Sequence, residues 1–198
     1  MFINISSDKV QIFDGKKDIF LDRNGIENIF GKTLVKINKK SPIKEIFLLN
    51  GPGGFTNLRV GTLCINLLNT LENQKIKIYD LDKFTLFKYL FSKGIIPNQG
   101  IVYIGQKKNI WIYDLNKNIY QKQELNNFNL DGKYFLDQVL DDDYYQGLDI
   151  KNMIYVSGNK DGIKVKYKSK EILISPKNLK IKAKKQVQAN YFIQATTD

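Results

Sequence analysis

A strand and a helix joined by a glycine-rich turn constrain the fold of this chain more than any other feature of its sequence. Residues 44–49, KEIFLL, form a short and mostly apolar run, which is typical of a strand buried on both faces of a parallel sheet. The turn Gly51-Pro52-Gly53-Gly54 follows, and Thr56 is a natural N-cap for a helix that runs to about residue 73. A buried strand that leads directly into a helix indicates an α/β protein with right-handed crossover connections.

Apolar runs bounded by turn residues continue this pattern on both sides of the unit. Before it, they predict a hairpin and a third strand, at residues 2–5, 10–13 and 19–21. Residues 26–37 are ambiguous and favour a short helix followed by an extended segment. After the unit, residues 76–79 predict the next strand and residues 82–91 a second helix.

The second half of the chain has a different pattern. Alternating apolar residues predict an antiparallel meander of three strands, at residues 101–104, 110–113 and 120–125. The elements expected after the meander are a short helix at 136–140, strands at 153–156 and 162–167, and a basic tail at 176–193. The stretch GIIPNQG separates the halves, so we expect an N-terminal lobe of residues 1–98 and a C-terminal lobe of residues 99–198.

The helix at 56–73 is apolar over more of its surface than its own sheet can cover. Its apolar positions are Leu58, Val60, Leu63, Cys64, Ile65, Leu67, Leu68 and Leu71. On a helical wheel, these positions exceed the single stripe of a surface helix. The sequence therefore predicts that a second face of this helix packs against something else.

The glycine turn has the composition of a phosphate-binding loop but not its key residues. A P-loop places Lys and then Ser or Thr directly after its last glycine, so that the Lys and the helix N-terminus both hold phosphate. Phe55-Thr56-Asn57 stands there instead, and the three glycines do not fit the dinucleotide pattern G-x-G-x-x-G. These residues predict a tight turn that needs positive φ angles rather than a phosphate site.

The residue types that are present exclude several kinds of catalytic site. The chain has no histidine, which removes the commonest general base and the commonest metal ligand. Cys64 is the single cysteine and falls within an apolar helix, where a thiol behaves as a small hydrophobic group. Acidic residues cluster at Asp80 with Asp82 and at Asp137 with residues 141–143, but solvated loops explain such clusters more often than catalysis does. We expect no metal, no cofactor and no catalytic residue.

Lysine dominates the net charge of +11. Of the 31 basic residues, only Arg23 and Arg59 are arginine, the residue that recognition of phosphates and bases usually employs. The tail lysines are either RNA-phosphate contacts or, more commonly for such a pattern, a solvated strand face; they are Lys180, Lys182, Lys184 and Lys185. No apolar run approaches the roughly 20 residues of a membrane helix, and no signal peptide is visible. With one cysteine, a cytoplasmic protein that does not bind membranes is expected.

The motif GPGGFTNLRVG at residues 51–61 closely resembles the GPGSFTGLRIG signature of the TsaB (YeaZ-like) family of bacterial tRNA threonylcarbamoyladenosine biosynthesis proteins. Eight of the eleven positions match: Gly51, Pro52, Gly53, Phe55, Thr56, Leu58, Arg59 and Gly61. Gly54 and Asn57 replace the Ser and the Gly of the family. The resemblance extends over about residues 44–90.

This resemblance implies a fold and a role. The fold is that of the actin-like ATPases, with two ribonuclease-H-like lobes and here a degenerate nucleotide site. The role is that of a non-catalytic subunit that binds the catalytic paralogue TsaD, which transfers a threonylcarbamoyl group to an adenosine beside the tRNA anticodon. An ATPase subunit, TsaE, completes the assembly, and tRNA is reached only through the complex.

The resemblance also implies that the partner packs on the helix after the motif and on the next helix. On that basis the expected contact residues are Leu58, Thr62, Ile65, Leu68, Asn69, Phe84 and Phe87. Without its partner, such an apolar face tends to bury itself against a copy, so we expect homodimers of the isolated chain. Arg59 either anchors the turn by bonding carbonyl groups, which we favour, or reaches a partner.

The sequence departs from the family at its start. The family's opening Ile-Asp-Thr-Ser is Ile3-Asn4-Ile5-Ser6 here, so the acid that would hold a metal or a nucleotide is absent. The chain is also short for the family. Two other functions stay open from the sequence: an independent ATP-dependent enzyme of the same superfamily, and a basic RNA-binding module.

Overall fold

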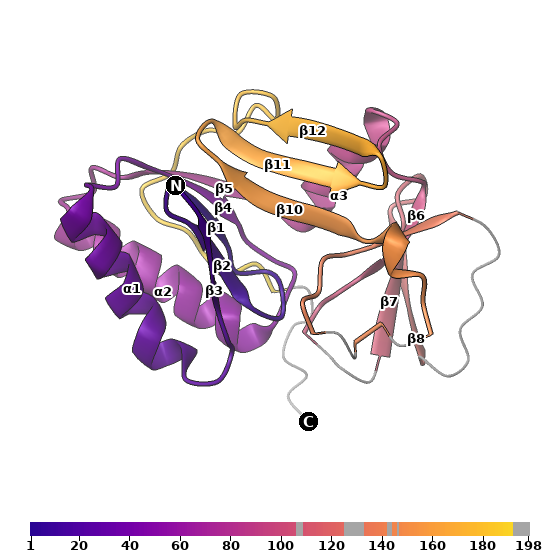
Figure 1. The fold of residues 1–198 in the computed structure, drawn as a ribbon, viewed down its shortest axis with the longest axis horizontal. Helices are drawn as coiled ribbons and strands as arrows, with labels where there is room; N and C mark the ends of the chain where they lie inside the picture. Colours follow the sequence, from indigo (N-terminus) through magenta and orange to yellow (C-terminus); the bar gives the residue numbers. More distant parts are fainter. Residues whose placement is uncertain (106–108, 125–132, 142–143, 146, 192–198) are drawn as a thin grey trace.

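The computed structural model describes residues 1–105, 109–124, 133–141, 144–145 and 147–191 (Figure 1). These residues form three β-sheets and three α-helices. The prediction of a mixed α/β protein is therefore confirmed. None of the helices described is long and apolar enough to span a membrane.

A five-stranded mixed sheet forms the N-terminal part of the molecule, with its strands in the order β3-β2-β1-β4-β5. Their bounds are β1 (Phe2–Asn4), β2 (Val10–Phe13), β3 (Asp18–Leu21), β4 (Glu45–Leu49) and β5 (Lys77–Leu81). The first three strands are antiparallel, and β4 pairs in parallel with both β1 and β5. The predicted hairpin, third strand and parallel strand are confirmed.

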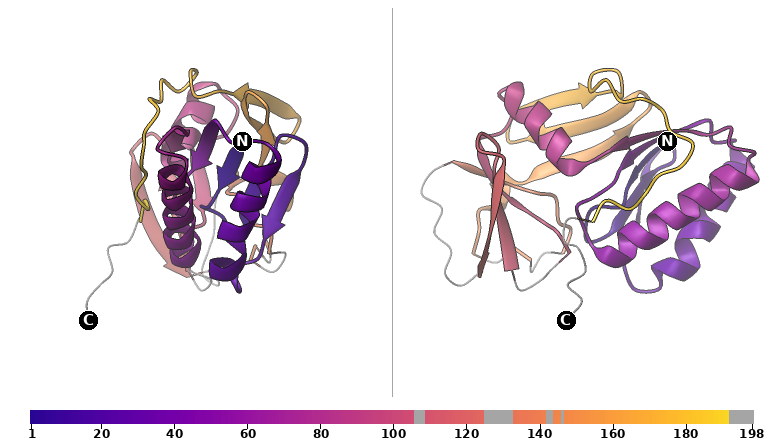
Figure 2. Two further views of the ribbon diagram at one scale, coloured as in Figure 1. Left: turned by 90° about the vertical axis from the view of Figure 1, so that its left-hand side faces the viewer. Right: turned by 180° about the vertical axis from the view of Figure 1, so that it is seen from behind.

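Alternate residues of β4 face two different layers of the protein. Ile46 and Leu48 lie in a core with α1 (Ile26–Lys40) and α2 (Phe55–Leu71), which pack side by side on one face of the sheet (Figures 1 and 2). Phe47 and Leu49 lie in a second core with α3 (Lys83–Ser92) and the last sheet. Burial on both faces explains why this strand is almost entirely apolar.

Two further sheets complete the described structure. One has the order β8-β7-β6-β9 and contains β6 (Gln99–Val102), β7 (Asn109–Asp114), β8 (Ile119–Glu124) and β9 (Tyr134–Leu136). The other contains the antiparallel strands β10 (Ile154–Asn159), β11 (Gly162–Tyr167) and β12 (Lys170–Ile174), after a short 3-10 helix, Ile150–Asn152. The predicted meander corresponds to β6, β7 and β8, whereas β12 has no counterpart among the predicted strands.

Three local predictions are wrong. The ambiguous segment at 26–37 is one continuous helix, α1, because Ile26, Phe30 and Leu34 form a buried stripe at helical spacing. Residues 136–140 are not helical, because β9 pairs in parallel with β6 up to Leu136 and the backbone N–H of Asp137 then donates to the carbonyl of Ile101. Thr56 is not the N-cap of α2, because α2 begins at Phe55 and Gly54 stands at the N-cap position.

Two features cross the predicted boundary between residues 98 and 99. The core that contains Phe47 also contains Val156 and Ile174. In addition, residues 184–190 return to the N-terminal half and lie along α2 and β5 (Figure 2). The division into lobes 1–98 and 99–198 stays a prediction.

Candidate functional site

The glycine turn is packed against two distant segments of backbone. Gly51 has φ +70°, and a Cβ atom on it would lie 2.2 Å from the carbonyl oxygen of Asn190. A Cβ atom on Gly53 would lie 2.4 Å from the carbonyl oxygen of Ser6. Because side chains at these positions would collide with backbone, glycine is required here for close packing. The predicted positive φ is present at Gly51 but not at Gly53 or Gly54.

Two asparagines hold the loop that faces the turn, and both stand at positions where the sequence departs from the TsaB signature or opening motif. Oδ1 of Asn4 accepts hydrogen bonds from the backbone N–H of Ser6 and from its hydroxyl, at 2.9 and 2.7 Å. Nδ2 of Asn57 donates to the carbonyls of Ser7 and Asp8, both at 3.0 Å. Ser6 and Ser7 are buried. The loop is thus bound to protein groups in the place where the resemblance puts a nucleotide site.

Hydrogen bonds from the second half of the chain close the same region. The hydroxyl of Ser7 donates to the carbonyl of Gln138 at 2.8 Å, and the backbone N–H of Leu140 donates to the carboxylate of Asp8 at 2.9 Å. Nearby, the ammonium group of Lys83 forms a buried ion pair with Asp137. Desolvation lowers the pKa of Lys83 and raises the pKa of Asp137, while their mutual attraction opposes both changes. These contacts tie α3 and the N-terminal loop to the segment after β9.

The exposed face of α2 carries a stripe of leucines. Leu63, Leu67 and Leu71 are 65%, 57% and 67% exposed, and their spacing of four residues places them along one side of the helix. The other faces of α2 are covered by the sheet, by α1 and by the tail. The surplus apolar face that the helical wheel predicts is therefore present.

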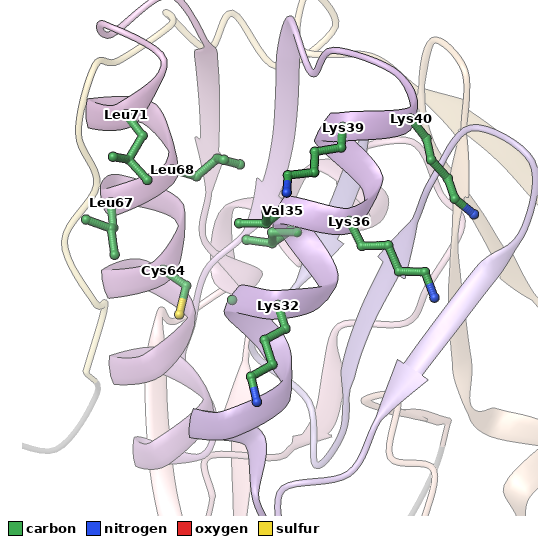
Figure 3. Close-up of a pocket in the computed structure, with 11 residues that line it drawn as sticks. Lys32, Val35, Lys36, Lys39, Lys40, Cys64, Leu67, Leu68 and Leu71 are labelled. Atoms are coloured by element: carbon green, nitrogen blue, oxygen red, sulfur yellow. The ribbon is translucent and has the colours of Figure 1, made fainter.

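A groove of about 700 Å³ runs between α1 and α2 beside these leucines (Figure 3). Its apolar walls are Leu34 and Val35 of α1 and Cys64, Leu67, Leu68 and Leu71 of α2. Four lysines of α1 border it: Lys32, Lys36, Lys39 and Lys40. This part of the surface is therefore an apolar groove with a basic border.

Two of the solved structures that are similar to this chain are related to YeaZ. One is YeaZ from Pseudomonas aeruginosa, at a TM-score of 0.40 and 11% sequence identity, covering 68% of this chain and 73% of that chain. The other is described as an uncharacterized protein with similarity to peptidase YEAZ from Pseudomonas aeruginosa, at a TM-score of 0.38 and 10% identity, covering 69% and 73%. No protein-family model and no curated protein matches the sequence. Similarity at this level does not define a family.

The residues expected to contact a partner need correction. Six of the seven are buried within the chain itself: Leu58, Thr62, Ile65, Leu68, Asn69 and Phe87. The seventh, Phe84, is partly buried, with its ring 4.4 Å from that of Tyr113 between centroids. Only Leu68 borders the groove, at its floor. The wheel shows that α2 has too many apolar residues for one face, but it does not show which face the sheet covers.

A ladder of asparagine side chains fixes the tail on α2 and is a feature that sequence reasoning missed. Asn66 donates to the carbonyl of Val187 and accepts from its N–H, at 2.8 and 3.0 Å. Asn69 donates to the carbonyl of Lys185 at 2.7 Å, and Asn50 to that of Gln188 at the same distance. The signal in the sequence is the presence of asparagines among the apolar residues of α2 and directly after β4. These contacts fix the course of the tail along α2.

The remaining residues of the glycine motif differ in their exposure and contacts. Phe55 is exposed and stacks on Tyr191, with 5.0 Å between ring centroids, and Thr56 accepts a hydrogen bond from Arg23. Gly54 and Gly61 are buried, and Pro52 is buried beside them. Arg59 is exposed, and among the described residues its guanidinium donates no hydrogen bond that would anchor the turn; its backbone carbonyl accepts a hydrogen bond from Thr62.

Two of the four tail lysines have partners within the protein. Lys184 pairs with Asp80 at 2.8 Å, and the ammonium of Lys185 donates to the carbonyl of Gln74 at 2.5 Å. Both contacts attach the tail to the N-terminal half. The tail lysines are therefore less available for RNA phosphates than their number in the sequence indicates. Among the described residues, no group of three or more acids and cysteines is placed to hold a metal ion.

Proposed function

We propose that this chain is a non-catalytic subunit of the assembly that makes threonylcarbamoyladenosine in tRNA, and that it binds the catalytic paralogue TsaD. The contact surface in this proposal is the exposed face of α2 together with the α1–α2 groove. TsaE and tRNA then meet the chain only within that complex. The proposal places the protein in the cytoplasm as an accessory subunit rather than an enzyme.

The observation that carries the proposal is the leucine stripe directly behind the glycine motif. The motif has eight of the eleven residues of the TsaB signature, and it starts the helix that presents Leu63, Leu67 and Leu71 to solvent. Exposed apolar patches beside a groove are typical of protein interaction sites. Helix faces with residues at this spacing pack well against other helices, as in four-helix bundles.

The N-terminal loop supports a role without nucleotide chemistry. An asparagine stands where the family has an acid, and its side-chain oxygen is bonded to Ser6. The backbone carbonyls after Ser6 are bonded to Asn57, and the Ser7 hydroxyl to Gln138. A nucleotide at this place would have to break these contacts.

Capture of TsaD tests the proposal. Tagged protein is mixed with TsaD from the same genome, and Leu67→Glu is compared with Leu173→Glu. Leu173 is 48% exposed on β12 and provides a matched control, since the same charge is introduced at an exposed leucine outside α1 and α2. We expect Leu67→Glu to weaken binding by at least about tenfold, because a carboxylate would replace an apolar contact. The control should bind as the wild type does.

Two outcomes favour the rival functions. Tight binding of Mg-ATP by the isolated chain in titration calorimetry would favour an independent enzyme. Binding of tRNA by the isolated chain, with an affinity that falls steeply as salt rises, would favour an RNA-binding module. Failure of the wild-type chain to capture TsaD would remove the proposal itself.

A further inference from the structure

The charged residues along the α1–α2 groove all have the same sign. Lys32, Lys36, Lys39 and Lys40 border it, and α2 contributes only apolar residues to its lining. In Figure 3, Lys32 and Lys39 lie on either side of Val35; Lys39 extends toward Leu68 of α2, Lys32 extends along the lower part of the groove, and Lys36 and Lys40 extend to the other side of α1. A helix lying in the groove would therefore pass between apolar walls and close to at least two ammonium groups.

No acidic side chain balances these lysines within the two helices. Glu27, in the first turn of α1, is the only acid between Ile26 and Lys40, and α2 has none from Phe55 to Leu71. Glu72, just after α2, accepts a hydrogen bond of 2.7 Å from Asn38 of α1. The α1–α2 surface is therefore strongly basic as a whole.

We infer that the groove is built for an amphipathic helix with carboxylates along its edge, on a different protein, and that its charge opposes pairing with a second copy of this chain. In a two-fold dimer, each subunit presents the same surface to the other. Two apolar grooves would then meet, but the net positive charge of each α1–α2 surface would face that of the other. Like charges brought together across an interface are unfavourable and reject wrong partners.

This inference rests on the proposed function for the location of the surface, and adds the chemistry of the partner. It also changes the expectation for the isolated chain. The apolar stripe favours homodimers and the lysines oppose them, so self-association should be weak at low salt. Salt screens the repulsion, since the Debye length falls from about 10 Å at 0.1 M to about 3 Å at 1 M.

A charge-reversed copy of the chain is a probe that tests this inference without TsaD. Lys32→Glu/Lys39→Glu keeps the apolar groove and gives it an acidic border. Sedimentation velocity at about 0.05 M and about 1 M NaCl then compares the wild type alone, the variant alone and an equimolar mixture. At low salt we expect the mixture to associate at least about tenfold more tightly than the wild type alone, and to weaken as salt rises. The wild type alone should associate more tightly as salt rises.

A matched control is Lys88→Glu/Lys93→Glu, which makes the same change of net charge at two exposed lysines on and next to α3. Mixed with the wild type, it should behave as the wild type alone. A wild-type dimer that is as tight at low salt as at high salt overturns the inference, and so does a groove-variant mixture no tighter than the control mixture.

If TsaD binds the wild type and the groove variant equally well, the inference fails and the proposed function stands. If TsaD binds neither, the proposed function fails, while the mixing experiment still decides the effect of charge.

Discussion

The ammonium nitrogen of Lys83 lies 2.5 Å from Oδ2 of Asp137, and the two side chains are only 2% and 6% exposed. Lys83 is the first residue of α3, and Asp137 follows β9 directly. The same ammonium donates to the carbonyl of Tyr103 at 3.2 Å, and the same carboxylate accepts from the N–H of Tyr103 at 3.1 Å. A buried charge pair with these additional hydrogen bonds joins the two halves of the chain at one point.

Replacement of Lys83 by Met should destabilise the protein by about 3–5 kcal/mol, because it leaves the Asp137 carboxylate buried without its partner. The double variant Lys83→Met/Asp137→Asn should recover more than half of that loss, since Asn still accepts the Tyr103 N–H and carries no charge. Urea unfolding followed by circular dichroism gives both free energies. If Lys83→Met lowers the free energy of unfolding by less than about 1 kcal/mol, the ion pair does not hold the two halves together.

The architecture of the N-terminal half is predictable from local patterns, whereas the return of the tail is not. An apolar run, a glycine turn and an amphipathic segment define β4 and α2 within a few residues of their observed bounds. By contrast, Asn66 meets Val187 and Lys83 meets Asp137 across long separations in sequence. Single polar residues of this kind have no periodicity, so nothing in the sequence pairs them before the fold brings them together.

The site was predictable only in part for the same reason. Helical periodicity shows that α2 has apolar residues on more than one face. Which of those faces is exposed depends on the position of α1 and of the tail, and both are consequences of tertiary packing. Leu63, Leu67 and Leu71, and not the residues that the sequence suggested, are therefore the exposed leucines of α2.

A methyl group on Gly53 should destabilise the protein, because its Cβ would lie 2.4 Å from the backbone carbonyl oxygen of Ser6. We expect Gly53→Ala to cost about 1–3 kcal/mol through forced shifts of the backbone. Gly54→Ser is the matched control, since the nearest atom to a Cβ there is the Tyr103 hydroxyl at 3.5 Å. Ser is also a better N-cap than Gly by a few tenths of a kcal/mol. Equal melting temperatures for the two variants would contradict the packing described for Gly53.

Removal of the Asn66 amide should release the tail from α2. Asn66→Ala loses both hydrogen bonds to the backbone of Val187, at a cost of about 1–3 kcal/mol. Amide hydrogen exchange at Val187 should become faster than in the wild type. Thr70→Ala is the control, because among the described residues the Thr70 hydroxyl bonds to the carbonyl of Asn66 within the same helix and not to the tail. If exchange at Val187 is the same in all three proteins, other contacts hold the tail.

Asp114 should make stability depend on pH in the acid range. The backbone N–H groups of Asn116 and Lys117 donate to its carboxylate, and hydrogen bonds of this kind lower the pKa of Asp114 below its ordinary value of 3.8. A lowered pKa in the folded state stabilises the protein above the unfolded value, and that contribution disappears as pH falls through the folded value. The free-energy difference between the wild type and Asp114→Asn should therefore be largest above about pH 5 and shrink toward about pH 2. A constant difference from pH 2 to 7 would show that the charge of Asp114 contributes nothing.

The single cysteine of the chain lies in the wall of the groove and reports directly on whether TsaD occupies it. Cys64 is half-buried, and burial raises the pKa of its thiol, so it reacts slowly but measurably with a maleimide. With TsaD at about ten times its dissociation constant, the labelling rate of Cys64 should fall by about tenfold, whereas in Leu67→Glu, with binding weakened at least about tenfold, it should fall by about twofold or less. If a complex forms and Cys64 reacts at the same rate as in the free chain, TsaD binds elsewhere and the α1–α2 groove is not its contact surface.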